Sequence, residues 1–354
     1  MAAMINQGFH RKLLVAACGL ALAVAPTVKG ELPRPDGEPA DMSQPVQVFI
    51  LLGQSNMVGF GEVGGPDREG SIKHSVREKG LYPFLVDEDG EWSVRKDVRN
   101  VFVMHRRGNM NVQANDWLRI GTTRRIGPEI GIGHHLGNLL DAPVMLLKSC
   151  IGNRSLGWDL LPPGSEQYEY DGRIYAGYKE SPDSWEVGEE PEPIDWYAGK
   201  QYDDDIGNVK KVLEDLETYY PGAEGYEIAG FFWWQGDKDR YNAAHATRYE
   251  QNLVRLIHAL REDFDAPDAK FVCATLGQTE KGAGGNEGHI LNAKLAVDGG
   301  SGKYPEFEGN VATVYTHPLS QGGASGGHYG NNGRTFMDVG LGMGEAMVRL
   351  LEGD

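Results

Sequence analysis

The chain of 354 residues carries 51 acidic and 34 basic residues, a formal net charge of −17, and 40% of its residues are hydrophobic. This hydrophobic content is typical of a globular protein with a buried core, and the length suits one large domain or two smaller ones. A surface this acidic repels polyanions. We therefore exclude nucleic acid and anionic membranes as partners and expect a neutral or weakly charged substrate.

The first 30 residues have the features of a secretory signal. Arg11 and Lys12 precede the apolar run 13–25, which is too short to span a bilayer comfortably. No later apolar run is as long, so we expect an exported protein, periplasmic or extracellular, with no stable membrane insertion once residues 1–30 are removed. The stretch ending in Cys18 resembles a lipoprotein cleavage box, but it follows the charges so closely that release is favoured over lipid anchoring.

A linker and then alternating strand and helix patterns follow the signal. Residues 31–45 are rich in Pro, Glu, Asp and Gly, which is typical of a linker, and we expect one domain over 46–354. Five apolar runs predict strands buried on both faces: 46–52, 143–147, 228–234, 271–276 and 311–315. Apolar residues spaced by three and four predict helices: 206–220, 249–260 and 335–351. This alternation predicts a single three-layer α/β/α domain around a parallel sheet.

Three stretches lack the strand and helix patterns, and two cysteines lie in or beside the apolar runs. Residues 60–122 and 160–204 have no clear period and predict long loops over the carboxyl edge of the sheet, while the Gly-rich residues 280–303 predict a mobile flap. Cys150 and Cys273 lie in or beside apolar runs, so the sequence allows either one disulfide or two buried free thiols. No cysteine cluster of the metal-binding type is present.

A small polar group follows the first predicted strand, in the sequence Gly53-Gln54-Ser55-Asn56-Met57. Residues at this place lie at the carboxyl edge of the sheet, where ligands bind in open α/β folds. Ser55 or Asn56 could cap a helix. Alternatively, Ser55 could attack a carbonyl if a histidine takes its proton. Taken alone, a serine at a strand end favours the cap.

Four blocks in order resemble the SGNH hydrolase superfamily, in the branch of carbohydrate esterase family 6 and the sialate O-acetylesterase-like, acetylxylan esterase-like proteins. They are GQSNM after the first strand, RRIGPEIGIG at 124–133, GFFWWQGDKD at 230–239 and the block opening SGGHYGNNGRTF at 325–347. The resemblance covers about 46–351 and implies a flavodoxin-like SGNH-hydrolase sheet. It also implies that Ser55 is the nucleophile and His328 the base.

The resemblance assigns the other site residues as well. The oxyanion hole would consist of the N–H groups of Ser55 and Gly127 and the side-chain amide of Gln235. Gln54, Asn56 and Trp158 would contact the substrate. Trp185 and Trp196 are further candidates for stacking on sugar rings, with ordinary loop packing as the alternative for all three tryptophans.

One departure concerns the acid behind His328. Many SGNH enzymes carry an aspartate three residues before the histidine, where this chain has Ser325. Another acid could orient the ring, with Asp237 the first candidate and Asp239 and Glu129 weaker ones. A backbone carbonyl could do so instead, which would leave a dyad, or the centre could be impaired.

The resemblance therefore implies an exported serine esterase that removes O-acetyl groups from an acetylated oligo- or polysaccharide, of the acetylxylan or sialate type, with no metal and no organic cofactor. The alternative is a non-catalytic carbohydrate-binding protein on a decayed esterase scaffold. A lipase is a third reading, although the sequence has no obvious apolar lid. The acetylated sugar and the oligomeric state remain open.

Overall fold

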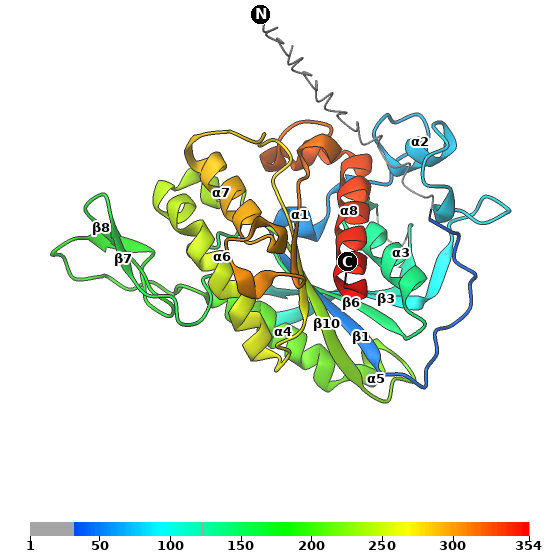
Figure 1. Cartoon of the computed structure of the whole chain (residues 1–354), viewed down its shortest axis with the longest axis horizontal. Coiled ribbons are helices and arrows are strands. Elements are labelled where there is room, and N and C mark those ends of the chain that lie inside the picture. Colours follow the sequence, from blue (N-terminus) through cyan, green and yellow to red (C-terminus); the bar gives the residue numbers. More distant parts are fainter. Residues whose placement is uncertain (1–31, 122–123, 354) are drawn as a thin grey trace, which may run out of the picture. The chain divides into compact units, whose positions relative to one another are not determined.

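The centre of the molecule is a seven-stranded sheet that contains β1 (Val46–Gly53). This computed structural model describes residues 32–121 and 124–353. The strand order is β12-β11-β10-β1-β6-β3-β4, and only β4 runs antiparallel to its neighbour (Figure 1). The remaining strands are β6 (Val144–Ser149), β10 (Tyr226–Trp234), β11 (Lys270–Ala274), β12 (Val311–Val314), β3 (Val94–Arg106) and β4 (Asn109–Arg119).

Helices cover both faces of the sheet. Alternate side chains of β1 enter two separate hydrophobic cores, because successive residues of a strand point to opposite faces. One core contains α4 (Lys200–Glu214), α6 (Ala243–Asp263) and α7 (Gly285–Ala296), and the other contains α3 (Glu129–Leu139) and α8 (Gly333–Glu352). The predicted three-layer α/β/α architecture is confirmed, and the sheet is parallel as predicted except for the edge strand β4.

All five predicted strands and all three predicted helices are present. The helix predicted over 206–220 begins earlier and is interrupted at Asp215, so that the short α5 (Leu216–Tyr219) follows α4. Residues 32–45 contain no helix or strand, and Leu32 and Met42 pack against the hydrophobic cores. The segment from Leu32 onward forms one compact unit.

The prediction of loops over 60–122 is wrong, because this stretch contains the long hairpin β3–β4. In β3, Val98, Val101 and Val103 are buried and pair with β6, but charged residues occupy much of the strand on both sides of them and two register shifts interrupt the pairing with β4. These irregularities hide the period of two from the sequence. The short elements nearby are β2 (Gly61–Glu62), α2 (Ile72–Arg77) and β5 (Arg125–Ile126).

Residues 160–204 hold a small antiparallel sheet within their loops, and residues 280–303 hold a helix. The small sheet consists of β7 (Tyr168–Tyr170), β8 (Arg173–Tyr175) and β9 (Ser184–Glu186). The prediction of a mobile flap is wrong because α7 packs against α6, with Ile290 and Lys294 fully buried. The 3₁₀ helices are Pro83–Leu85, Asp239–Tyr241, Gly299–Ser301, Pro305–Phe307, His317–Leu319 and Ser325–Asn331.

Both described cysteines are free thiols. Cys150 and Cys273 are buried and unbonded, and burial raises the pKa of the Cys273 thiol to about 11. Within residues 32–121 and 124–353, no helix is long and apolar enough to cross a membrane. The predicted signal at 1–30 and the lipid attachment considered at Cys18 lie outside the described residues.

Candidate active site

Ser55 opens a very short helix directly after the central strand. Gly53, at φ 147°, approaches the carbonyl of Trp234 so closely that a side chain would collide with it. The chain then enters α1 (Ser55–Val58), and Ser55 keeps 8% of its surface exposed. The N-cap position is Gln54, and no side chain caps the helix. The interpretation of Ser55 or Asn56 as a helix cap is therefore wrong.

A glycine from the neighbouring strand's loop lies against Ser55. A Cβ atom added to Gly152 would stand 3.4 Å from the Cβ of Ser55. Gly152 follows β6, which is the parallel neighbour of β1, so both residues lie at the carboxyl edge. Within the described part of the chain, the N–H groups of Ser55 and Gly152 have no acceptor. The sequence analysis had not singled out Gly152.

Gly127, the predicted second oxyanion donor, lies beside Gly59 at the other end of α1. Its N–H donates to the Oε1 atom of Glu129 at 2.9 Å. Glu129 also pairs with the buried Lys148 at 2.6 Å, and Lys148 donates to the carbonyl of Val58 at 3.2 Å. Gly127 thus belongs to a buried polar cluster that holds the end of α1, and its N–H is already engaged. Glu129, a weaker candidate for the acid, is bound in the same cluster.

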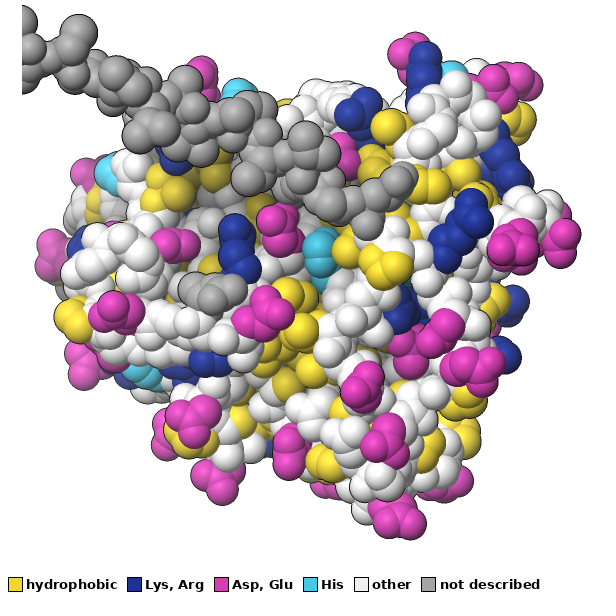
Figure 2. All heavy atoms as spheres, turned by 45° about the vertical axis from the view of Figure 1, so that its right-hand side comes forward, with side chains coloured by type: hydrophobic (Ala, Val, Ile, Leu, Met, Phe, Trp, Pro, Cys, Tyr) yellow, Lys and Arg dark blue, Asp and Glu magenta, His cyan; other side chains and the backbone are white. Residues whose placement is uncertain are grey.

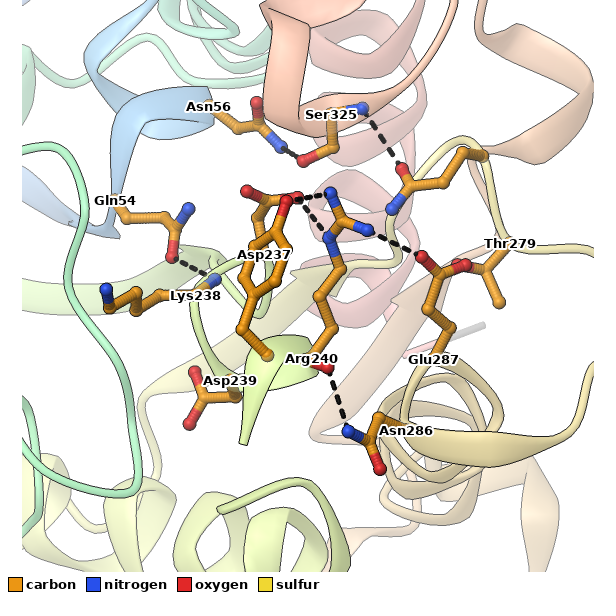
Figure 3. Close-up of polar contacts among 12 residues, drawn as sticks. Gln54, Asn56, Asp237, Lys238, Asp239, Arg240, Thr279, Asn286, Glu287 and Ser325 are labelled. Carbon is orange, nitrogen blue, oxygen red and sulfur yellow. Dashed lines mark hydrogen bonds and ion pairs between the residues drawn. The ribbon is translucent and has the colours of Figure 1, made fainter. Parts of the chain in front are cut away.

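Gln235 is fully buried at the end of β10. Its Nε2 atom donates to Asp239 Oδ2 at 2.5 Å, to the carbonyl of Arg154 at 2.8 Å and to Gln54 Oε1 at 3.2 Å. Its Oε1 atom accepts from the hydroxyl of Tyr249 at 2.8 Å. Every polar atom of this amide therefore has a protein partner. Gln54 Oε1 also accepts the backbone N–H of Lys238 at 3.2 Å (Figure 3).

Asp239 connects Gln235 to the loop that carries Gly152. The carboxylate accepts the backbone N–H of Leu156 at 3.0 Å and that of Gly157 at 2.8 Å, in addition to the amide of Gln235. The side chain is fully buried, and burial raises its pKa. Asp239, another weaker candidate for the acid behind His328, serves here as a clamp on the loop.

The segment that carries His328 folds back onto α1. Asn56 Nδ2 donates to Ser325 Oγ at 3.0 Å (Figure 3) and also to the hydroxyl of Tyr329 at 3.4 Å. The same hydroxyl accepts the N–H of Gly277 at 3.1 Å, and burial raises the pKa of Tyr329 to about 12. These contacts bring the first and last sequence blocks together. They also assign Asn56, predicted to contact substrate, to a structural bond.

His328 is half-buried and stands on an unusual turn. His328, Tyr329, Gly330 and Asn331 have φ values of 51°, 52°, 61° and 59°, a run of left-handed residues that is unfavourable for the three that are not glycine. The imidazole stacks on the ring of Phe60, with centroids 3.8 Å apart and planes 5° apart. Among the residues that the structure describes, His328 has no hydrogen bond to Ser55 or to a carboxylate.

Charged neighbours set the protonation of His328. Burial lowers its pKa, the charge of Asp237 raises it, and that of Arg125 lowers it, with a net decrease. The imidazole is therefore neutral at pH 7 and able to accept a proton. Asp237 bonds to Arg240 Nε at 2.8 Å, and Arg240 in turn pairs with Glu287 at 2.9 Å (Figure 3).

A cavity of about 860 Å³ opens beside the loop of Gly152. Ile151 and Arg154 flank that glycine and line the cavity, together with Trp196 and the turn of the β3–β4 hairpin. Of the three tryptophans considered for sugar stacking, only Trp196 lines it. Trp158 and Trp185 instead pack against the small cluster formed by Leu161, Ala176 and Ala198.

The described residues contain no group of three or more His, Cys, Asp or Glu side chains arranged to hold a metal ion.

Comparison with protein families identifies the class of enzyme. Residues 180–335 match the family model described as carbohydrate esterase, sialic acid-specific acetylesterase, a span that contains Gln235 and His328 but not Ser55. The match confirms the resemblance to the sialate O-acetylesterase-like branch. It also confirms the prediction of a carbohydrate O-acetylesterase, a carboxylic ester hydrolase.

No curated protein matches the chain. Among solved structures, XAC1771, a carbohydrate acetylesterase from Xanthomonas citri, is 11% identical with a TM-score of 0.51, over 87% of this chain and 57% of that one. AT4G34215 from Arabidopsis thaliana is 17% identical with a TM-score of 0.49, over 86% and 98% of the two chains. NanS is 16% identical with a TM-score of 0.39, over 79% and 80%. The likeness to XAC1771 confirms the fold, and this chain spans little more than half the length of that protein.

Proposed function

We propose that this chain, which matches the sialic acid-specific carbohydrate acetylesterases over residues 180–335, is a serine esterase that removes O-acetyl groups from a glycan. One observation carries the proposal. Ser55 lies at the carboxyl edge of the central strand, against the backbone of Gly152, and the adjacent Asn56 bonds to the turn that carries His328. A nucleophile, two backbone donors and a base thus come from one small region.

The proposed reaction begins when neutral His328 accepts the proton of Ser55 and the Oγ atom attacks the acetyl carbonyl. The carbonyl oxygen becomes an oxyanion, which the N–H groups of Ser55 and Gly152 stabilise. The C–O bond between the acetyl carbon and the sugar oxygen then breaks, and the His328 imidazolium protonates the departing sugar oxygen. Water, deprotonated by His328, attacks the acetyl-serine, and His328 returns the proton to Ser55 Oγ as acetate leaves.

The proposal changes the roles of two predicted residues. Gly152 replaces Gly127 as the second backbone donor, because the N–H of Gly127 is already donated to Glu129. Gln235 positions the Gly152 loop through Asp239 and Arg154 rather than meeting the oxyanion itself. Asp237 is proposed to stabilise the His328 imidazolium by its charge.

Substitution of Ser55 tests the proposal. We expect Ser55→Ala to lower the rate of acetate release from acetylated xylan and p-nitrophenyl acetate by at least about 10³-fold, since the residual rate comes only from binding and the oxyanion donors. The matched control is Ser301→Ala in a 3₁₀ helix far along the chain. A fluorophosphonate should label the wild type and not Ser55→Ala.

Two outcomes would contradict the serine mechanism. Equal hydrolysis by Ser55→Ala and wild type would remove Ser55 as nucleophile. Glycan binding by the wild type without turnover or labelling would favour the carbohydrate-binding alternative, for which Ser325 in place of the usual aspartate is the motivating feature.

Export is part of the same proposal. The basic and apolar pattern of residues 1–30 supports cleavage before the described residues begin. N-terminal sequencing of protein recovered from the periplasm and the medium of an expressing bacterium tests this, and a cytoplasmic product that retains Met1 would contradict it.

A further inference from the structure

The lining of two cavities next to the candidate active site has a charge opposite to that of the chain. The cavities measure about 860 Å³ and about 320 Å³; the first is lined by Ile151 and Arg154, on either side of Gly152, and the second by Val58, Gly59 and Phe60 at the end of α1. Together they are lined by seven basic residues and three acidic ones, whereas the whole chain has 34 basic and 51 acidic residues. The basic ones are Arg106, Arg107, Arg119, Arg125, Lys148, Arg154 and Lys200; the acidic ones are Glu129, Asp195 and Asp204. Acidic side chains are spread over the face seen in Figure 2.

Several of these cations already have partners. Lys148 pairs with Glu129 at 2.6 Å, Lys200 with Asp204 at 2.6 Å, and Arg119 with Asp116 at 2.8 Å. Arg106 and Arg107 differ: both are exposed, and neither guanidinium pairs with an acid in the described residues. Arg106 also lines both cavities, so it stands at the border between them.

The backbone at the tip of the β3–β4 hairpin gives an independent indication. Arg107 and Gly108 form its two-residue turn, with φ values of 53° and 77°. Such turns favour Asn-Gly or Gly-Gly, because both central residues need positive φ. Placing a long basic side chain in the first position costs about 1 kcal/mol. An unfavourable residue at the mouth of a cavity indicates a role in binding.

The first cavity also offers groups that bind sugars. Trp196 lies in its lining, with Arg154 5.1 Å from the ring centroid, and Asn109 and Asn111 line the same cavity while their Nδ2 atoms donate to carbonyls of the hairpin turn. Aromatic rings pack on the apolar faces of sugars, and amides bond to their hydroxyls. The cationic groups therefore lie beside a surface suited to a sugar ring.

We propose that the substrate is an O-acetylated polyanionic glycan, and that Arg106 and Arg107 bind the carboxylate or sulfate of a sugar unit adjacent to the acetylated one. This proposal rests on the proposed esterase function and names its substrate class. It replaces the neutral substrate expected from the overall charge. At 0.1 M salt, acids more than about 10 Å away are screened, so the local cations dominate.

The experiment compares glycans that differ in charge. Acetate release is measured from acetylated xylan, from the same xylan after sulfation, and from acetylated polygalacturonate, for wild type and the double variant Arg106→Gln/Arg107→Gln. The control variant is Arg255→Gln, an exposed arginine on α6 that lines neither cavity. We expect the loss of kcat/KM in the double variant to be about tenfold larger on an anionic polymer than on neutral xylan, mainly because KM rises. A loss confined to the sulfated or to the carboxylated polymer identifies the anion.

Three results would overturn the proposal: a wild type that prefers neutral xylan, equal losses on neutral and anionic polymers, or an O-acetylated sialic acid monosaccharide hydrolysed as well as the polymers and insensitive to the double variant. Failure of the esterase function is distinguished by a second measurement. Affinity electrophoresis measures binding of non-acetylated polygalacturonate and sulfated xylan to Ser55→Ala. This binding does not depend on catalysis, and we expect it to require Arg106 and Arg107.

Discussion

The two sides of the candidate site are held in different ways. On one side, Gln235 and Asp239 are fully buried, and hydrogen bonds bind them to each other and to the loop of Gly152. On the other side, His328 is half-buried, stands on a run of left-handed residues and is held by stacking on Phe60. Oxyanion donors must be rigid before the charge develops. A base must accept and then return a proton, which a ring held by stacking alone can do without breaking a hydrogen bond.

Among the substitutions that separate the two sides, the largest effect is expected from breaking the rigid side. In Asp239→Asn, an amide faces three donors, so at least one buried N–H loses its acceptor, at a cost of about 1–3 kcal/mol. We expect kcat to fall about 10- to 100-fold because Gly152 is displaced, with KM changed less than about twofold. Steady-state kinetics on acetylated xylan give this split.

Asp205→Asn is the matched control for that substitution. Asp205 is also a fully buried aspartate with a raised pKa, but it accepts from the side chains of Ser149 and Gln201 and from no backbone N–H of the Gly152 loop. We expect it to retain most of kcat. If Asp239→Asn keeps the full kcat, the hydrogen bonds of Asp239 to the Gly152 loop do not position the oxyanion donors.

A smaller effect is expected from straining the His328 turn. Gly330 has φ 61°, and an added Cβ would stand 2.9 Å from the carbonyl oxygen of Gly322. Gly330→Ala should therefore lower the free energy of unfolding by about 1–2 kcal/mol, measured by urea denaturation. Gly323→Ala is the comparison, since its φ is also positive but nothing lies within 4 Å of the added atom. A larger loss in Gly323→Ala would contradict close packing at Gly330.

The smallest effects concern the protonation of His328. Its lowered pKa means that activity is at a plateau near pH 7 and falls as the pH drops through this pKa, because the protonated ring cannot act as base. Asp237→Asn removes the charge that raises the pKa, so the acid limb of kcat/KM should move to lower pH. Arg125→Gln removes a charge that lowers it, so the limb should move to higher pH. Shifts in the same direction for both variants would exclude His328 as the titrating base.

Much of the sheet could be predicted because its strands carry a local signal. Residues 46–52 and 228–234 are apolar at nearly every position, since a central parallel strand is buried on both faces. The edge hairpin β3–β4 gave no such signal, because charged residues and register shifts interrupt its pattern. Helix α7 was missed because the glycines around its start outweighed the few apolar residues that it buries.

The sequence by itself determined the three-layer architecture, the class of esterase, and Ser55 and His328 as the candidate pair, because short blocks and apolar runs are local features. The tertiary structure decided that Gly152 rather than Gly127 lies against Ser55, that Asp239 binds the loop, and that basic side chains line two cavities next to the site of an acidic protein. These contacts join residues that lie far apart in the sequence, such as Ser55 and Gly152 or Gly157 and Asp239. Composition and spacing along the chain carry no information about such distances in space. Only the packing of the parallel strands into one sheet brings their carboxyl ends together.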